Sequence, residues 1–223
     1  MHSMQLKLKP TITALMVLCG LGGLAATTVF AQQNDSEPAQ NAESKLKTQE
    51  FSWSVLNPEG AGFEVLMPGK PRPVSRQIAL NPDENTTVQM YIVALDGGKM
   101  NAVVAYHDVQ EDPKNNKQRD EILDGGIAGT LLRLIPSTLV PWDKDQDAEK
   151  EKIDRSKIDG YFGRRFAYTG MQRGRQIAGH SQLVLDGQRV FQLSVIRTGK
   201  TPVNEALIEQ FLSSFKVVKP ADK

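Results

Sequence analysis

The sequence predicts an α+β protein in which an antiparallel β-sheet of about six to seven strands packs against two main helices, behind a signal peptide. Two observations support this fold class. Runs of alternating apolar and polar residues are joined by turns too short for a crossover, which favours antiparallel pairing. Two other segments repeat their apolar residues at helical spacing, so each offers an apolar stripe that can cover a sheet.

Residues 1–31 have the features of a secretory signal peptide. Lysines precede an apolar stretch, and Ala31 is the small residue before the expected cut. A membrane anchor is the competing interpretation, but the stretch is short and contains three glycines. A lipid on Cys19 is not expected, because Leu18 is too large for a lipoprotein cleavage site. We expect an exported protein, periplasmic or extracellular, or in the thylakoid lumen of a photosynthetic source.

The mature chain should contain a linker, one α+β domain and a short tail. Residues 32–50 are polar and poor in β-branched and aromatic residues, which indicates a disordered linker before the domain at 51–218 and the tail at 219–223. Cleavage removes the only cysteine and two lysines, so the formal net charge falls from +1 to −1. The mature chain therefore has no thiol chemistry, no expected integral membrane span, and no charge surplus that would favour nucleic acid.

The first half of the domain should be mainly strands. Apolar runs at residues 51–56 and 62–67 indicate two short strands, the second ended by Pro68. The alternating runs at residues 86–95 and 100–109 flank the turn residues Asp-Gly-Gly, which predicts a hairpin. A helix is expected over residues 116–135, although three glycines weaken it by about 1 kcal/mol each relative to alanine.

The second half should be a three-stranded meander followed by a helix. The predicted strands are residues 161–169, 176–185 and 189–197, and the helix is residues 202–214, followed by a final strand at 215–218. Gly199-Lys200-Thr201 matches the end of a phosphate-binding loop motif, but Ser194 occupies the position where that motif needs a glycine. We interpret Gly199 as the bend out of the strand, Thr201 as the helix N-cap, and Pro202 as the first helical residue.

Catalytic chemistry has few candidates in the mature chain. Only His107 and His180 remain after cleavage, which excludes a three-histidine metal site. No Gly-x-Ser-x-Gly sequence is present to expose a nucleophile. His107 shares a strand face with apolar residues and is expected in or at the edge of the core. We expect no cofactor, no metal and no catalytic residue, and we keep an enzyme centred on His107 or His180 as an alternative.

Charge is unevenly distributed along the domain. Residues 160–200 contain seven basic residues and one acid, whereas residues 108–159 contain thirteen acids and nine bases. Arginine recognises carboxylate and phosphate groups through planar, bidentate contacts. We therefore predict partner-binding residues at Arg173 and Arg175, on a hairpin tip, and at Arg164 and Arg165, which point to opposite faces of their strand. The expected partner is an unknown protein or an anionic envelope component.

Several stretches together resemble a group of uncharacterised exported bacterial proteins with the PsbP-like α/β/α sandwich fold. The stretches are GFEVLMPGKPRPV, DEILDGGIAGTLL, DGYFGRRFAY, GQRVFQLSV and EQFLSSFKVV, and the resemblance covers about residues 51–218. The fold is shared by the extrinsic PsbP proteins of photosystem II and a Ran-GTPase-binding protein. The resemblance implies an antiparallel sheet between helices and a non-enzymatic binding or assembly role. It transfers no functional residue to this chain.

The expected function is therefore that of an exported, non-catalytic binding or accessory domain of the cell envelope. Two alternatives stay open. One is a periplasmic hydrolase or metal-dependent enzyme that uses His107 or His180 in a concave site. The other is a binder of a small ligand or lipid in a cavity between helix and sheet.

Overall fold

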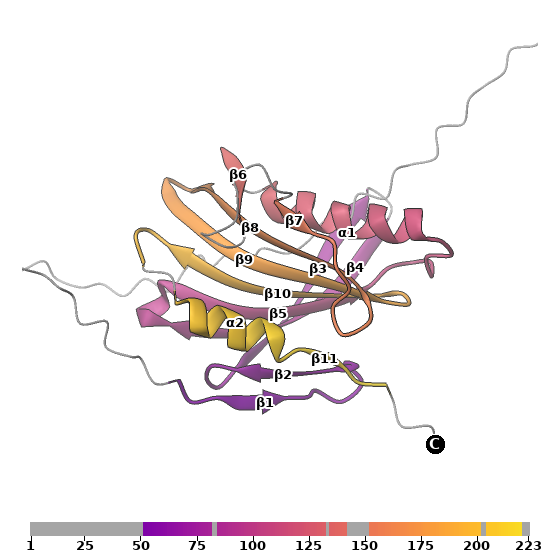
Figure 1. Cartoon of the computed structure of the whole chain (residues 1–223), viewed down its shortest axis with the longest axis horizontal. Helices are drawn as coiled ribbons and strands as arrows, with labels where there is room; N and C mark the ends of the chain where they lie inside the picture. Colours follow the sequence, from indigo (N-terminus) through magenta and orange to yellow (C-terminus); the bar gives the residue numbers. More distant parts are fainter. Residues whose placement is uncertain (1–50, 82–83, 133, 142–151, 202–203, 220–223) are drawn as a thin grey trace, which may run out of the picture.

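The computed structural model describes residues 51–81, 84–132, 134–141, 152–201 and 204–219. The expected signal peptide, the linker, Pro202 and most of the tail lie outside these residues. The described part is α+β (Figure 1). Its elements are β1 (Ser54–Leu56), β2 (Phe63–Met67), β3 (Arg72–Asn81), β4 (Glu84–Leu95), β5 (Met100–Asp108), α1 (Asn116–Leu131), β6 (Ser137–Val140), β7 (Ile153–Asp154), β8 (Phe162–Gln172), β9 (Arg175–Asp186), β10 (Arg189–Thr198), α2 (Glu205–Ser213) and β11 (Lys216–Val217).

Eight strands form the main sheet, and all of its pairs are antiparallel. The strand order is β3-β4-β5-β10-β9-β8-β6, and β7 also pairs with β8. The predicted hairpin is confirmed as β4 and β5, and the predicted meander is confirmed as β8, β9 and β10. Because β10 pairs with β5, the meander and the hairpin join into one continuous sheet.

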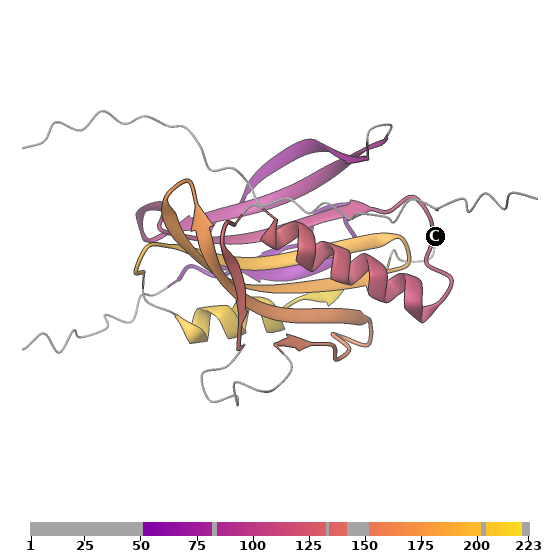
Figure 2. The same cartoon turned by 90° about the horizontal axis from the view of Figure 1, so that it is seen from above.

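A second, three-stranded sheet corrects the expectation of a single sheet. The predicted strands near the two ends of the domain become β1, β2 and β11, which pair with one another in the order β1-β2-β11. The small sheet and α2 lie on one side of the main sheet, and α1 lies on the other (Figure 1). Seen from above, α1 lies across the strands of the main sheet (Figure 2). The described part is therefore layered, with the main sheet in the middle.

Apolar side chains fill the spaces between these layers. The larger cluster joins the main sheet to α2 and β2, with Phe63, Phe191 and Phe211 fully or almost fully buried. A second cluster lies under α1 and includes Leu123 and Phe166. A third is formed by β4 and β5, on the same face of the main sheet as α1. Strand alternation explains the division, because successive side chains of one strand enter opposite faces.

Both helices are shorter than predicted. Helix α1 begins after Asn115, whose side chain accepts from the Gln118 N–H at 2.9 Å, and it ends at Leu131 rather than at residue 135. Its glycines Gly126 and Gly129 are buried on the side that faces the sheet, as expected if they permit a close approach. Helix α2 begins three residues later than expected, because Asn204, not Thr201, accepts from a first-turn N–H.

The turn before α2 has a different role for Thr201. Its hydroxyl donates to the carbonyl of Thr198 at 2.8 Å, which closes the turn instead of capping the helix. Gly199 has a φ of 66°, so the predicted bend is confirmed. The sequence interpretation missed β3, β6 and β7, which are edge or very short strands.

Candidate functional site

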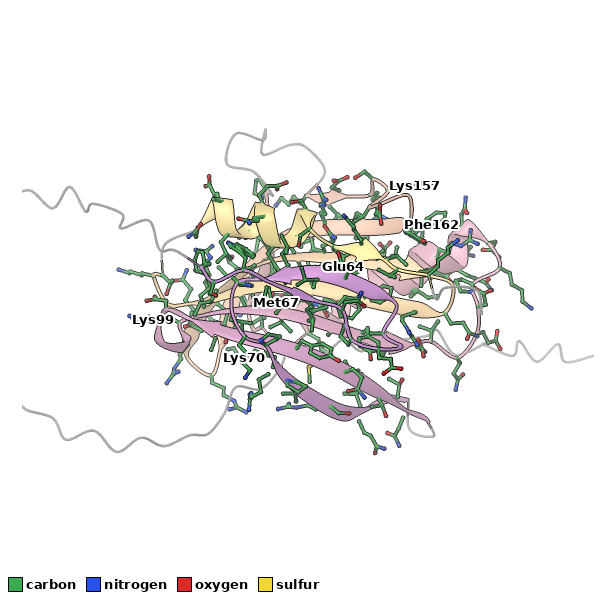
Figure 3. All side chains as sticks on the ribbon, turned by 90° about the horizontal axis from the view of Figure 1, so that it is seen from below. Glu64, Met67, Lys70, Lys99, Lys157 and Phe162 are labelled. Atoms are coloured by element: carbon green, nitrogen blue, oxygen red, sulfur yellow. The ribbon has the colours of Figure 1, made fainter. Side chains whose placement is uncertain are left out.

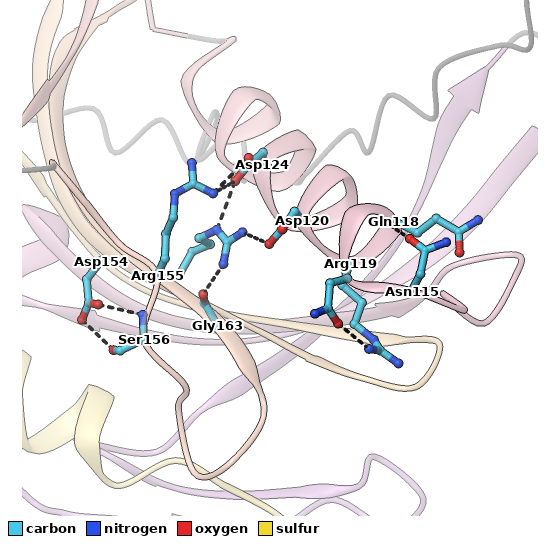
Figure 4. A network of polar contacts seen from close by, with 11 residues as sticks. Asn115, Gln118, Arg119, Asp120, Asp124, Asp154, Arg155, Ser156 and Gly163 are labelled. Carbon is cyan, nitrogen blue, oxygen red and sulfur yellow. Dashed lines mark hydrogen bonds and ion pairs between the residues drawn. The ribbon is translucent and has the colours of Figure 1, made fainter.

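Arg164 does not lie on the surface, so its prediction as a partner-binding residue is wrong. Its side chain is 2% exposed and sits between β8 and α1. Its Nε donates to Asp124 at 3.1 Å, its Nη2 pairs with Asp120, and its Nη1 donates to the Gly163 carbonyl at 2.8 Å (Figure 4). Asp120 and Asp124 are four residues apart on one face of α1. Arg164 is therefore a structural residue that fastens α1 to the sheet.

Arg165 points to the opposite face of β8. It is half-buried, and its Nε donates to Oε1 of Gln182 at 2.9 Å. The Nε2 of Gln182 donates to the Leu212 carbonyl at 3.4 Å, which places Arg165 and Gln182 on the α2 side of the main sheet. The structure therefore separates Arg165 from Arg164 and from the hairpin tip.

Arg173 and Arg175 are exposed at the tip between β8 and β9. Gln172 pairs with Arg175, so Arg173 and Gly174 form a two-residue turn, with φ values of 50° and 75°. Positive φ at both positions is typical of a type I′ hairpin turn, where asparagine and glycine are favoured. Arg173 therefore adopts a left-handed conformation that is costly for its side chain. Among the described residues, no acidic side chain pairs with either arginine.

Two lysines lie at the turns beside this tip. The Gly199 N–H donates to the Gln176 carbonyl at 2.8 Å, which brings Lys200 next to the start of β9. The Thr198 N–H donates to the Lys99 carbonyl at 2.8 Å, which places the start of β5 at the same end of the sheet (Figures 1 and 3). We call the four exposed cations Lys99, Arg173, Arg175 and Lys200 the basic end. The exposed Asp96 lies in the turn just before Lys99.

Exposed apolar side chains border the basic end. Leu132 is 62% exposed, Ile135 is 79% exposed, and Met171 is 36% exposed. The Ile135 N–H donates to the Met171 carbonyl at 2.8 Å, so the segment that follows α1 lies against the hairpin tip. We call these three residues the apolar rim. The sequence interpretation missed it, because Leu132 and Ile135 fell inside the predicted helix.

The opposite end of the meander has its cation paired. Arg189 donates to the two Asp108 oxygens at 2.7 and 3.0 Å, and to the carbonyls of Gly60 and Ala61. Hydrogen bonding to Asp108 raises the pKa of Arg189. A pocket of about 480 Å³ opens beside Arg189, lined by the turn between β1 and β2 and by strand ends. Since this guanidinium already has its partners, it is a structural clamp.

The histidines do not form a catalytic constellation with one another. His107 is 2% exposed on β5, and burial lowers its pKa to about 4. His180 lies on β9, opposite Val195, and is half-buried. Neither histidine lines the pocket beside Arg189. Within the described ranges, no three histidine, cysteine or acidic side chains lie together as metal ligands.

A buried polar network under α1 was also missed. The Ser181 and Ser194 hydroxyls are 2.7 Å apart, and Nε2 of Gln192 lies 3.2 Å from both Ser194 Oγ and Thr130 Oγ1. Burial raises the pKa of the nearby Tyr168 to about 12, so its phenol stays neutral. These groups are buried beneath α1, where they contribute to the packing of the helix on the main sheet.

The described helices and the comparisons with known proteins add little about function. None of these helices is both long and apolar enough to cross a membrane. No protein-family model matches the chain, and no curated protein matches it in sequence. One similar solved structure is that of PA94 from Pseudomonas aeruginosa, a protein of unknown function. It is 10% identical, covers 76% of this chain and 99% of its own, and gives a TM-score of 0.44.

Proposed function

We propose that this protein is an exported, non-catalytic binding or accessory module of the cell envelope, with a PsbP-like sandwich fold, and that its basic end docks on an anionic surface. One observation carries the proposal. In the meander, Arg164 and Arg189 are satisfied by carboxylates, whereas Arg173 and Arg175 extend from a turn with no acidic partner among the described residues. Unpaired exposed cations grouped at one end favour electrostatic docking of an anionic partner.

The layered architecture and the histidine positions support a binding role. The main sheet lies between α1 on one face and α2 with the small sheet on the other, an arrangement compatible with a sandwich. His107 is buried and uncharged at neutral pH, and a general base needs access to its substrate. The buried position of His107 therefore gives no support to the alternative of an enzyme centred on this histidine.

The docking test is retention of envelope components on immobilised protein. Charge reversal of Arg173→Glu with Arg175→Glu should abolish retention of the partner, because both cations become repulsive anions. A matched control is Lys114→Glu with Lys117→Glu, which reverses two exposed cations near the start of α1, at the opposite end of the main sheet. Retention that falls equally in both variants, or in neither, would rule out the basic end as the docking surface.

Export has its own test. The apolar stretch and Ala31 support cleavage of residues 1–31, so the protein recovered from the envelope fraction should begin at Gln32. Mass spectrometry of the intact protein measures this directly. A chain recovered in the cytoplasm with residues 1–31 present would contradict export and leave the docking proposal untouched.

A further inference from the structure

We infer that the basic end and the apolar rim together form a docking tip for an anionic phospholipid surface. This inference rests on the proposed function and specifies its partner. Met171 and Arg173 are two residues apart on the same hairpin, and Ile135 is hydrogen-bonded to Met171. Aliphatic side chains beside unpaired arginines are the combination that interfacial anchors use, in which apolar groups enter the headgroup boundary and cations attract anionic lipids.

The apolar rim is exposed in a way that suits lipid. Ile135 is 79% exposed and Leu132 is 62% exposed, on the segment that closes α1. Specific protein interfaces place anchors, often aromatic, in complementary pockets, and they need close shape matching. The rim has no aromatic ring, and the pocket beside Arg189 lies at the other end of the meander. Acyl chains accept protruding aliphatic groups without shape complementarity.

The cations supply the preference for anionic lipid. Each lysine or arginine near an anionic membrane surface strengthens binding about fivefold. Arg173, Arg175 and Lys200 are exposed at adjoining turns, and Lys99 adds a fourth cation beside Asp96. Because β5, β8, β9 and β10 all present their turns at this end, the cations can face one plane together.

The backbone of the tip is an independent observation in favour of function. At the first position of its turn, Arg173 has a φ of 50°, where asparagine fits better than arginine. Residues held in unfavourable backbone conformations cluster at functional sites, where the cost in stability is tolerated for the sake of function. The unfavourable backbone of Arg173 therefore supports a binding role for its side chain, since an asparagine would form the same turn at lower cost.

The experiment is co-sedimentation of the full-length chain with vesicles of phosphatidylcholine mixed with phosphatidylglycerol, and with vesicles of phosphatidylcholine alone. All variants carry the same residues 1–50, so any contribution of the N-terminal apolar stretch cancels in the ratio to wild type. Wild type should prefer the anionic vesicles, and added salt should weaken the preference. Arg173→Asn should bind about fivefold more weakly, and it should fold at least as stably as wild type.

Two further variants separate charge from apolar insertion. Arg173→Glu with Arg175→Glu should weaken binding to the anionic vesicles by more than about twentyfold. Ile135→Ser with Met171→Ser should weaken binding to both vesicle types, because it removes the inserting side chains without changing charge. Lys114→Glu with Lys117→Glu, the control near the start of α1, should bind as wild type does.

Each remaining outcome decides between the proposals. Tip variants that bind the anionic vesicles as wild type does overturn the lipid inference. If vesicles are not bound but retention of an envelope protein depends on Arg173 and Arg175, the partner is an acidic protein and the proposed function stands. If neither vesicles nor envelope protein respond to the tip variants, both proposals are wrong.

Discussion

The two ends of the β8–β9–β10 meander use arginine in opposite ways. At the β9–β10 end, Arg189 is held by Asp108 and by two backbone carbonyls, and a glycine occupies the position of positive φ in the turn. At the β8–β9 end, Arg173 itself has the positive φ, and no described acid pairs with it. The β9–β10 turn therefore has glycine at its position of positive φ and a paired arginine. The β8–β9 turn has an arginine at positive φ and no paired acid.

The difference indicates which arginines of the meander are available to bind a partner. An arginine that forms an ion pair with a carboxylate stabilises the fold, as Arg164 does under α1. An exposed arginine with no such ion pair is available to a partner. Substitutions at the paired arginines should therefore lower stability and spare binding, whereas substitutions at the hairpin tip should weaken binding without lowering stability.

The largest expected effect is the removal of the acids that pair with Arg164. Asp120→Asn with Asp124→Asn should lower the free energy of unfolding by about 3–5 kcal/mol, because a cation that is 2% exposed loses its counter-charges. Urea denaturation measures the loss. The control is Glu121→Gln on the same helix, whose ion pair with Lys117 is exposed and should contribute little. A loss below that of the control would show that Arg164 is not the clamp.

The second effect is loss of stability in acid through His107. Burial lowers its pKa from 6.5 to about 4, so the folded state favours neutral histidine. The stabilisation is complete above pH 6.5 and is lost as the pH falls toward 4, by up to about 3 kcal/mol. His107→Gln should flatten stability across this pH range. An equally steep decline in that variant would assign the acid sensitivity to other groups.

The third effect contrasts the meander ends directly. Arg189→Ala should lower the free energy of unfolding by about 1–2 kcal/mol, since it breaks hydrogen bonds to Asp108 and to the β1–β2 turn at a partly exposed site. Its binding to anionic vesicles should match wild type. A selective loss of vesicle binding with normal stability would reverse the roles assigned to the two ends.

The smallest effect has the opposite sign. Arg173→Asn should raise the free energy of unfolding by about 0.5–1 kcal/mol, because asparagine tolerates the left-handed position of the turn. Thermal unfolding beside wild type measures the gain. The matched control is Arg175→Asn. It makes the same substitution at a position without positive φ, so it should give no comparable gain.

The sequence predicted the strands that are marked by alternating apolar residues and by turn residues at their ends. The meander was found because its strands alternate and Asp186-Gly187 marks a turn, and the observed strands differ from prediction by no more than a few residues. β3 was missed because Pro73 and several polar residues hide its alternation at a sheet edge. Which strands join the small sheet depends on distant pairings such as β2 with β11, which no local pattern encodes.

The candidate site was predicted in part for the same reason. Charge counting located Arg173 and Arg175 at the hairpin tip. It could not tell that α1 would cover Arg164, although Asp120 and Asp124, four residues apart on a helix, were the available signal. The apolar rim depended on where α1 ends, and helix ends are set by capping contacts that the apolar spacing does not reveal.

The most direct measurement compares vesicle affinity and unfolding free energy in a single variant, Arg173→Asn. If unpaired charge at the hairpin tip is retained for binding, the variant unfolds at higher denaturant and releases anionic vesicles at lower salt than wild type. A variant that is less stable than wild type, or one whose affinity for those vesicles is unchanged, contradicts the account.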